Sequence, residues 1–480
     1  SGLTPTKASE RLKPQKQVTF FPFLKDLSYF CSDNKKTYHR NLTNTTMQYT
    51  VSAPASLHAT IQLPASKSIS NRVLILHSLA HGNILPCNLS DCDDTMVMTR
   101  ALDGNPGHID ILAAGTAMRF LTAYLSVTPG TRIITGTQRM QQRPIRILVD
   151  ALRELGARIE YVRNEGFPPL HITGTELKGE EISLAGNVSS QYISALLMIG
   201  AVLPKGLRLH LTGDIISRPY INLTLQLMRD FGAQADWTSK DCITVSPGGY
   251  TDTPFTVESD WSAASYWYQM MAIEGIKNEI LEMKGEDGSS AKESENSAKE
   301  KTHLAEIELL GLFAHSYQGD SRGAEVFARL GVHTEYTNRG VKLTRKGIPA
   351  ARLDEDMVDI PDLAQTFVVT CCLMNIPFRF TGLQSLKIKE TDRITALITE
   401  LRKLGYVIRS EQDSILLWDG ERCPEDAAPV IATYEDHRMA MAFAPTCLAL
   451  PHIRIDEPQV VSKSYPAYWN DLQKAGFKVE

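Results

Sequence analysis

A short pattern recurs five times along this chain: an amphipathic helix, a glycine and a short strand. The five copies end their helices at Gly156, Gly232, Gly331, Gly405 and Gly476. Glycine is the usual residue just after a helix because it adopts a positive φ without a steric penalty. Each copy is therefore predicted to form one helix–turn–strand unit of an α/β fold.

The spacing of these glycines indicates a duplicated architecture. Successive glycines are 76, 99, 74 and 71 residues apart, and the long interval contains residues 284–301, which are rich in Gly, Ser, Glu and Lys. Because this stretch has no apolar periodicity, we expect a disordered surface insert. Residues 94–102 are interpreted as a shortened first copy, which gives about six units of roughly 75 residues. This period is too long for a solenoid and indicates a duplicated domain of three units.

Length and composition exclude several classes of protein. The chain has 480 residues, more than one core usually holds, so two domains are expected. Its net charge of −5 gives no basic excess for nucleic acid. Its longest nearly apolar runs, residues 192–203 and 439–450, are much shorter than the roughly 20 residues that span a membrane. The eight cysteines show no zinc-like spacing, which favours reduced thiols in a cytoplasmic protein.

Residues 1–46 differ from the rest of the chain. They contain eight lysines and arginines against three acidic residues, and no apolar segment of a secretory signal. We expect this basic tail to lie outside the fold. A transit peptide and a natural start at Met47 are both compatible with its composition.

A polar helix start at residues 63–72 predicts an anion site. Three serines, an asparagine, a lysine and an arginine lie between Ser66 and Arg72, directly before an apolar run. Pro64 ends the preceding strand, and Ser66 or Ser68 is a natural N-cap. The free N–H groups of a first helical turn, with hydroxyls and cations around them, favour a bound anion. The alternative is an ordinary capped helix with solvated charges.

Comparable polar clusters precede other apolar helices. They lie at residues 114–119, 139–146, 188–191, 217–220, 359–362, 387–393 and 434–439. Taken singly, each is a good helix cap. Seven cations nevertheless lie near these helix starts, the unfavourable end of the helix dipole for positive charge. They are Lys67, Arg72, Arg119, Arg143, Lys389, Arg393 and Arg438. Because cations recur at this unfavourable end of the helices, we expect these side chains to bind anions.

Eight segments and Lys463 carry a resemblance to a known enzyme family. In order, the segments are LPASKSISNR, AGTAMRF, RMQQRPIRILVDALRELGA, VSSQY, SRPYI, DIPDLAQT, KIKETDRI and YEDHRMAMAF. From about residue 48 to the C-terminus, their order and approximate spacing are similar to those of the 5-enolpyruvylshikimate-3-phosphate synthase family. KETDR together with DHRMAM is highly specific for that family.

The resemblance implies an α/β fold of two inside-out α/β barrel domains, each of three βαβαββ repeats, with a cleft between them. By this resemblance the first domain is residues 67–258. The second is residues 47–66 together with 259–480, and two crossing segments join the domains. This division agrees with the six predicted units.

The resemblance also implies a reaction of aromatic amino acid (chorismate) biosynthesis. The enolpyruvyl group of phosphoenolpyruvate moves to the 5-hydroxyl of shikimate 3-phosphate, and phosphate is released. We expect a monomer with no cofactor, no metal, and no nucleic-acid or membrane partner. Two anionic substrates need several cations and many neutral donors.

The residues that match the family's sites are implied by this resemblance alone. For shikimate 3-phosphate they are Lys67, Ser68, Arg72, Ser189, Ser190, Gln191, Ser217, Tyr220, Asp362 and Lys389. For phosphoenolpyruvate they are Lys67, Gly115, Arg143, Gln191, Arg393, Arg438 and Lys463. The catalytic group is Asp362, Glu390 and Lys67. Asp362 is expected to accept the 5-hydroxyl proton, and Glu390, beside Lys67, to protonate the methylene carbon.

The chain departs from the family's common pattern at Ala113, Phe120, Ser385 and Glu435. These positions affect expected affinity and domain closure, not the expected reaction. The stretch Gly-Thr-Ala-Met-Arg at Gly115 resembles members that are sensitive to glyphosate, an inhibitor that occupies the phosphoenolpyruvate site.

Two alternatives remain at this point. The related UDP-N-acetylglucosamine enolpyruvyl transferase has a catalytic cysteine in a loop of its first domain, and residues 136–140 here contain no cysteine. A non-catalytic anion-binding homologue is the second alternative, although Lys67, Asp362, Glu390 and Arg438 are all present.

Overall fold

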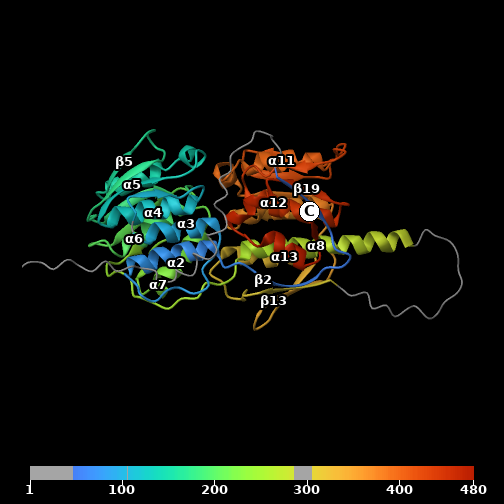
Figure 1. The fold of residues 1–480 in the computed structure, drawn as a ribbon, viewed down its shortest axis with the longest axis horizontal. Coiled ribbons are helices and arrows are strands. Elements are labelled where there is room, and N and C mark those ends of the chain that lie inside the picture. Colours follow the sequence, from blue (N-terminus) through green and yellow to red (C-terminus); the bar gives the residue numbers. More distant parts are fainter. Residues whose placement is uncertain (1–46, 105, 286–304) are drawn as a thin grey trace, which may run out of the picture.

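A computed structural model describes residues 47–104, 106–285 and 305–480 of the chain. These residues form two lobes that lie side by side (Figure 1). Each lobe has its own hydrophobic core, one built from residues 65–257 and the other from residues 51–63 and 261–477. The predicted tail at 1–46 and residues 286–301 of the predicted insert lie outside the described residues.

Five four-stranded sheets share one topology. In spatial order, the first strand pairs in parallel with the second, the second pairs antiparallel with the third, and the third pairs antiparallel with the fourth. The first lobe contains two of them. One is β3 (His108–Asp110), β4 (Gly130–Thr135), β6 (Leu170–Gly174) and β5 (Arg158–Tyr161). The other is β7 (Glu180–Ala185), β8 (Leu207–Thr212), β10 (Cys242–Val245) and β9 (Ala235–Trp237).

The second lobe contains the other three sheets. The first is β2 (His58–Gln62), β11 (Glu306–Leu310), β13 (Gly340–Arg345) and β12 (Val332–Tyr336). The second is β14 (Leu353–Asp356), β15 (Phe378–Thr381), β17 (Ile415–Trp418) and β16 (Arg409–Glu411). The third is β18 (Val430–Ile431), β19 (Ile453–Asp456), β1 (Gln48–Ser52) and β20 (Lys478–Val479).

The five predicted helix–glycine–strand units correspond to these five sheets. Each of the five glycines has a positive φ, between 83° and 104°, and the strand that follows it is an edge strand of its sheet. The expected sixth, shortened unit is different. Within the described residues, that part of the chain contributes an isolated parallel bridge between Cys87 and Thr256 instead of a four-stranded sheet. The predicted α/β class is thus confirmed, and the unit that was expected to be shortened is the one that forms no four-stranded sheet of its own among the described residues.

The segment before residue 66 belongs structurally with the C-terminal half of the chain. Strand β1 pairs with β19 and β20, and β2 pairs in parallel with β11. The two crossing segments lie against each other, because the Ser66 N–H donates to the Glu258 carbonyl and the Asp260 N–H donates to the Pro64 carbonyl, both at 2.9 Å. The domain division at these crossings stays a prediction, and these pairings support it.

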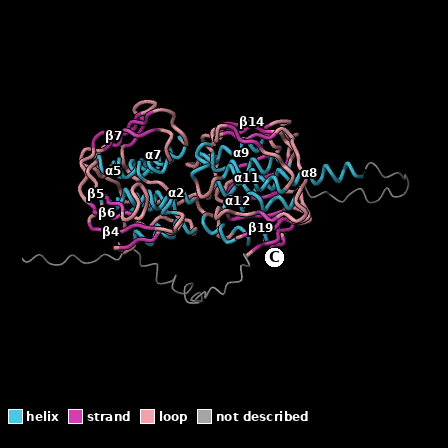
Figure 2. Tube along the Cα trace, turned by 90° about the horizontal axis from the view of Figure 1, so that it is seen from above, coloured by secondary structure: helices cyan, strands magenta, loops and turns pink. Residues whose placement is uncertain are grey.

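The helices lie inside the lobes and the sheets lie outside, as Figure 2 shows most clearly for β5 and β7. Helices α6 (Ser190–Gly200), α10 (Ala364–Leu373) and α12 (His437–Phe443) are buried along nearly their whole length. A helix that is apolar all round is stable only when it is enclosed. Strands such as β7 and β8 instead alternate buried and exposed residues, as expected for a sheet with one solvated face.

The remaining helices are α2 (Lys67–Leu79), α3 (Asp93–Leu102), α4 (Gly115–Val127), α5 (Arg146–Glu154), α7 (Arg218–Asp230), α8 (Trp261–Gly285), α9 (Gly323–Ala328), α11 (Arg393–Lys403) and α13 (Tyr468–Lys474). Helix α8 ends at Gly285, so residues 284 and 285 are helical and the predicted start of the insert is wrong by two residues. The sequence that leads up to the insert is rich in strong helix formers, which explains why the helix continues. Within the described ranges, no helix has the length and apolarity that would let it cross a bilayer.

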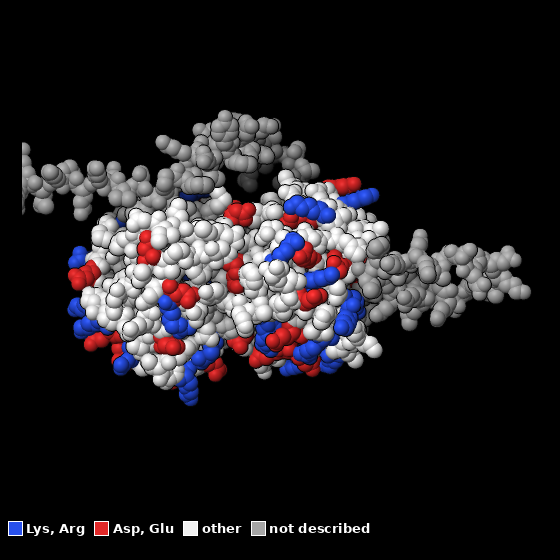
Figure 3. Space-filling model, turned by 90° about the horizontal axis from the view of Figure 1, so that it is seen from below, with Lys and Arg blue, Asp and Glu red and all other residues white. Residues whose placement is uncertain are grey.

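Short 3₁₀ helices complete the fold. They are η1 (Met140–Gln142), η2 (Gly319–Arg322), η3 (Pro361–Leu363), η4 (Gln384–Ile388), η5 (Ala444–Leu448) and η6 (Pro458–Lys463). On the face drawn in Figure 3, acidic and basic side chains are interspersed over both lobes.

Candidate active site

One pocket between the lobes gathers the residues that the sequence singled out. Of the sixteen predicted site residues, fifteen line it: Lys67, Ser68, Arg72, Gly115, Arg143, Ser189, Ser190, Gln191, Ser217, Tyr220, Asp362, Lys389, Glu390, Arg393 and Arg438. The sixteenth, Lys463, lies behind this lining, and its ammonium group is 3.3 Å from the Glu390 carboxylate. Residues that are almost 400 positions apart in the sequence therefore meet in one place.

The pocket lies where helices of both lobes begin. Residues that line it come from the starts of α2, α4, α6 and α7 in one lobe and of α8, η3–α10, α11 and α12 in the other. Ser66 caps α2 by accepting from the Ile69 N–H at 3.4 Å, as predicted. Free N–H groups and helix dipoles at these ends favour negative charge, so the backbone adds to the cations that line the pocket.

Asp362 is held by three cations. Arg393 Nη1 lies 3.1 Å and Lys389 Nζ 3.3 Å from its Oδ1, and Arg438 Nη2 lies 3.1 Å from its Oδ2. Burial alone would raise the pKa of Asp362, but the three cations outweigh burial and hold that pKa well below its usual range. Asp362 is therefore an ionised carboxylate at the centre of the site.

Glu390 has different partners from those expected. Its carboxylate accepts from Arg393 Nη2 at 2.8 Å and lies 3.3 Å from Lys463 Nζ. Burial opposes its charge, but Lys463, Arg393 and further cations keep the pKa of Glu390 well below its usual range. Glu390 is near enough to Lys67 to help raise the pKa of that lysine, but the ion-pair partner of Lys67 is a closer carboxylate.

The closer carboxylate is Asp94, whose Oδ2 lies 3.3 Å from Lys67 Nζ. Although burial disfavours a charged lysine, Asp94 raises the pKa of Lys67 above its ordinary value. Lys67 is thus a fixed cation in the wall of the pocket. Sequence reasoning placed Asp94 only in a helix, although two consecutive acidic residues at a helix start were a visible signal.

The neutral donors come from the first lobe. Ser189 caps α6 by accepting from the Gln191 N–H at 3.4 Å, and the Gln191 amide donates to the Thr116 hydroxyl at 3.2 Å. Ser217 adopts a left-handed conformation with φ of 54°, and its N–H donates to the Val358 carbonyl of the other lobe at 3.2 Å. Such a conformation is costly for a residue with a side chain and is typical of functional loops.

Two of the arginines predicted to bind anions at helix starts donate hydrogen bonds to other groups of the protein. Arg72 donates to the hydroxyls of Thr224 at 2.7 Å and Ser194 at 3.1 Å, at the edge of the pocket. Arg119 donates to the carbonyls of Gly115 at 3.0 Å and Pro144 at 3.3 Å and does not line the pocket. The interpretation of Arg119 as an anion-holding cation is therefore wrong, because a buried guanidinium can also brace the backbone.

Other side chains of the lining were missed by sequence reasoning. They are Asp94, Thr116, Asp260, Ser262, Tyr266, His437 and Ser464. His437 lies directly before Arg438, and neither of its ring nitrogens has a hydrogen-bond partner among the described residues. Burial first, and then Lys67 and Arg438, lower the pKa of His437 well below its usual range, so this ring is neutral. Within the described ranges, no group of three or more His, Cys, Asp or Glu side chains is arranged to hold a metal ion.

Comparisons with known proteins agree with this geometry. The family model described as EPSP synthase (3-phosphoshikimate 1-carboxyvinyltransferase) matches residues 51–104, 105–284 and 302–472. A 3-phosphoshikimate 1-carboxyvinyltransferase of Bacteroides fragilis is 67% identical over 434 residues, covering 90% of this chain and 99% of the relative. One of Shewanella halifaxensis is 34% identical over 441 residues, covering 86% and 96%.

Solved structures support the fold. An EPSP synthase from Acinetobacter baumannii has a TM-score of 0.68 to this chain at 20% sequence identity, and the match covers 91% of this chain and all of that one. With the family model, the identity of the relatives and the shared fold in agreement, this chain belongs to the EPSP synthase (3-phosphoshikimate 1-carboxyvinyltransferase) family.

Proposed function

We propose that this protein transfers the enolpyruvyl group of phosphoenolpyruvate to the 5-hydroxyl of shikimate 3-phosphate and releases phosphate. The observation that carries the proposal is the position of two carboxylates, Asp362 and Glu390, on one buried arginine, Arg393, at 3.1 and 2.8 Å. The pocket around them is lined by cations from both lobes. A base and an acid held together in one anion site are what an addition to phosphoenolpyruvate requires.

Shikimate 3-phosphate is assigned to the side of the first lobe. Its phosphate is bound by Ser189, Ser190, Ser217 and Lys389, which supply three hydroxyl donors and one ammonium. Its carboxylate is bound by Ser68 and Arg72, and Gln191 and Tyr220 contact the ring. Lys67 lies between the two substrates. This assignment follows the family motifs and is supported by the common lining of these residues.

Phosphoenolpyruvate is assigned to the side where the two lobes meet. Its phosphate is bound by Lys67, Arg143, Gln191 and Lys463, beside the backbone of Gly115. Its carboxylate is bound by Arg393 and Arg438, whose planar guanidinium groups fit a carboxylate in two-point contact. These two arginines also form ion pairs with Asp362, so the substrate carboxylate competes with Asp362 for them.

This competition supplies the base. When the substrate anions engage Lys389, Arg393 and Arg438, the cations that suppress the pKa of Asp362 are partly neutralised, and Asp362 gains affinity for a proton. Asp362 then takes the proton of the 5-hydroxyl, the O–H bond breaks, and the oxygen electron pair forms a bond to C2 of phosphoenolpyruvate.

Glu390 supplies a proton to C3 in the same step. An anionic phosphate near Lys463 and Arg143 raises the pKa of Glu390, so that the group arrives protonated. The tetrahedral adduct collapses when C3 loses a proton to Glu390 and the C2–O bond to phosphate breaks, with the proton held by Asp362 passing to the phosphate. Glu390 is then protonated again and Asp362 is again a carboxylate.

The test is phosphate release. Purified protein is mixed with phosphoenolpyruvate and either shikimate 3-phosphate or UDP-N-acetylglucosamine, and phosphate is followed over time. We expect release only with shikimate 3-phosphate. Release with the amino sugar would assign the protein to the related transferase, and no release with either would support a non-catalytic anion-binding protein.

A further inference from the structure

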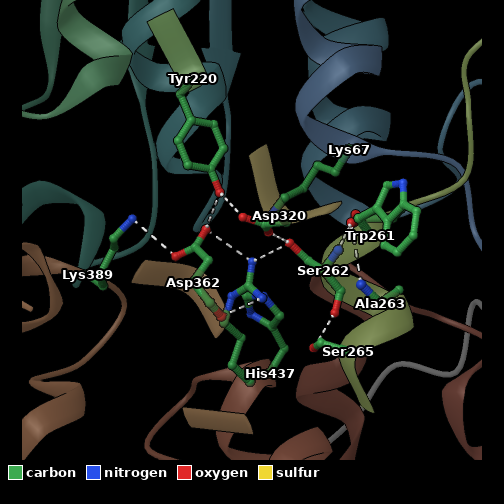
Figure 4. A network of polar contacts seen from close by, with 12 residues as sticks. Lys67, Tyr220, Trp261, Ser262, Ala263, Ser265, Asp320, Asp362, Lys389 and His437 are labelled. Carbon is green, nitrogen blue, oxygen red and sulfur yellow. Dashed lines mark hydrogen bonds and ion pairs between the residues drawn. The ribbon is translucent and has the colours of Figure 1, made fainter. Parts of the chain in front are cut away.

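A third carboxylate lies next to the proposed base and has no role in the reaction as described so far. Asp320, in η2 of the second lobe, is only 4% exposed. Figure 4 shows it behind Asp362, on the side away from Lys389. A carboxylate with so little exposure is costly unless its partners stabilise it, so those partners indicate why it is there.

Tyr220 connects the two carboxylates. Its hydroxyl is 3.2 Å from Asp362 Oδ2 and 3.4 Å from Asp320 Oδ1 (Figure 4). A phenol has one proton to donate. Tyr220 can therefore satisfy one carboxylate at a time, and the other must be neutral or bound to something else.

Ser262 and Arg438 form a second connection. The Ser262 hydroxyl makes a short hydrogen bond to Asp320 Oδ2, and Arg438 Nη2 donates to both the Ser262 oxygen at 3.4 Å and Asp362 Oδ2 at 3.1 Å. The two carboxylates thus belong to one closed ring of hydrogen bonds. A change in the charge of either carboxylate therefore changes the pKa of the other, both through these hydrogen bonds and through space.

The groups that face Asp320 come from four elements. They are Asp362 of η3, Arg438 of α12, Tyr220 of α7, and Asp260 and Ser262 at the start of α8. Burial first, and then the charge of Asp362, raise the pKa of Asp320 to about 6, and Arg438 and Ser262 limit the rise. Asp320 therefore changes charge near pH 6.

We infer that Asp320 is a positioning residue for the proposed base: its negative charge, transmitted by Tyr220 and by Ser262 with Arg438, keeps the Asp362 carboxylate ready to accept the substrate proton. This inference rests on the proposed function. Three cations make Asp362 a weak base, and the negative charge of Glu390 opposes them. Asp320 and Asp362 also repel each other, so an ionised Asp320 adds to this opposition. When Asp362 takes the 5-hydroxyl proton, the Tyr220 hydroxyl can turn its hydrogen bond from Asp362 to Asp320, and the only proton that the ring gains is the one taken from the substrate.

The experiment measures kcat at saturating substrates from pH 5 to 8 for the parent and Asp320→Asn. Asparagine resembles the protonated acid in shape. We expect a parent-to-variant ratio near one at pH 5 that rises through about pH 6 to roughly tenfold above pH 7, because without the Asp320 charge the pKa of Asp362 is lower and its carboxylate is a weaker base. Titration of the substrate phosphates affects both proteins equally and cancels in the ratio.

Asp471→Asn is the matched control. Asp471 is 2% exposed, accepts from the Tyr465 hydroxyl at 2.9 Å, and lies in α13 outside the pocket lining. Its ratio to the parent should be constant with pH. A constant ratio for Asp320→Asn as well would assign Asp320 a merely structural role and overturn the inference.

Ser262→Ala tests the same idea with Asp320 intact, which matters if Asp320→Asn does not fold. The hydrogen bond from Ser262 lowers the pKa of Asp320. In Ser262→Ala this bond is lost, so kcat should rise with a midpoint at higher pH than in the parent. An unmoved midpoint overturns the inference. A parent that releases no phosphate overturns the proposed function and this inference with it, whereas an active parent with flat ratios overturns this inference alone.

Discussion

The hydroxyl of Ser462 lies 2.5 Å from the carboxylate of Asp93, and this hydrogen bond joins the two lobes beside the pocket. Ser462 directly precedes Lys463, and Asp93 directly precedes Asp94, the partner of Lys67. The contact therefore lies next to Lys463 in one lobe and next to Asp94 in the other. Arg139 also makes a contact between the lobes, from its Nε to the Glu390 carbonyl at 3.4 Å.

We predict that Ser462→Ala raises the KM for phosphoenolpyruvate about fivefold and changes kcat little, because one exposed hydrogen bond to a carboxylate contributes about 1 kcal/mol to closure. Steady-state kinetics measure both constants. Ser410→Ala, on the exposed strand β16, is the control.

The same contact predicts hinge closure in solution. Shikimate 3-phosphate should draw the cationic faces of the lobes together and reduce the radius measured by small-angle scattering. Ser462→Ala should need more of the ligand for the same decrease. An unchanged radius at saturating ligand would count against a hinge.

Asp362→Asn should lower turnover by roughly 10²–10⁴, since the amide keeps the size of the base but cannot take a proton. Shikimate 3-phosphate should still bind, because Ser189, Ser190 and Ser217 are untouched. Turnover is measured by phosphate release and binding by calorimetry. Near-normal turnover of the variant would show that Asp362 is not the base.

Gly115→Ala should weaken glyphosate more than phosphoenolpyruvate. A Cβ built on Gly115 lies 2.6 Å from Arg143 Nη1, so the methyl group displaces a cation assigned to the phosphoenolpyruvate phosphate. We therefore expect KM to rise as well, but less than the inhibition constant of the slightly longer inhibitor. A displacement of this kind costs on the order of 1–3 kcal/mol, or about 5- to 150-fold in affinity.

The test of Gly115 compares both constants in both proteins. Competitive inhibition of the parent by glyphosate is expected. Equal shifts in the two constants, or a parent that ignores millimolar glyphosate, would show that Gly115 does not border the inhibitor.

Asp320 should also affect stability with pH. A carboxyl whose folded pKa is raised from its ordinary value near 3.8 to about 6 stabilises the folded state at low pH, and this stabilisation is lost as pH rises through 6. The shift corresponds to about 3 kcal/mol in total, of which about half falls between pH 5 and 7.5.

Asp320→Asn should therefore gain stability relative to the parent as pH rises over that interval. Urea unfolding at both pH values measures the difference. A relative stability that stays constant would mean that the pKa of Asp320 is not raised.

Local patterns predicted a large part of this structure. Gly156 and its four counterparts mark the turns into five edge strands, because positive φ is a local requirement that the sequence displays directly. Ser66 and Ser189 act as caps for the same reason. The family motifs, which extend over most of the chain, identified fifteen residues of the pocket lining.

Properties that depend on distant neighbours were not predicted. Lys67 pairs with Asp94 and not with Glu390, since the choice depends on how α2 packs against α3. Arg119 resembles the pocket cations in sequence but points at carbonyls. Asp320 stands in a plain Gln-Gly-Asp-Ser stretch, and its importance appears only when Tyr220 of the other lobe comes within 3.4 Å.

The pairing of β1 and β2 with the C-terminal half has a consequence for the newly made chain. Thr60 of β2 lies opposite Glu308 of β11, 248 residues later. At about 5–20 residues per second, a ribosome needs roughly 10–50 s to bridge that distance. Residues 67–258 can be complete in this time, while two strands synthesised earlier wait with unpaired edges, the kind of surface on which chaperones act.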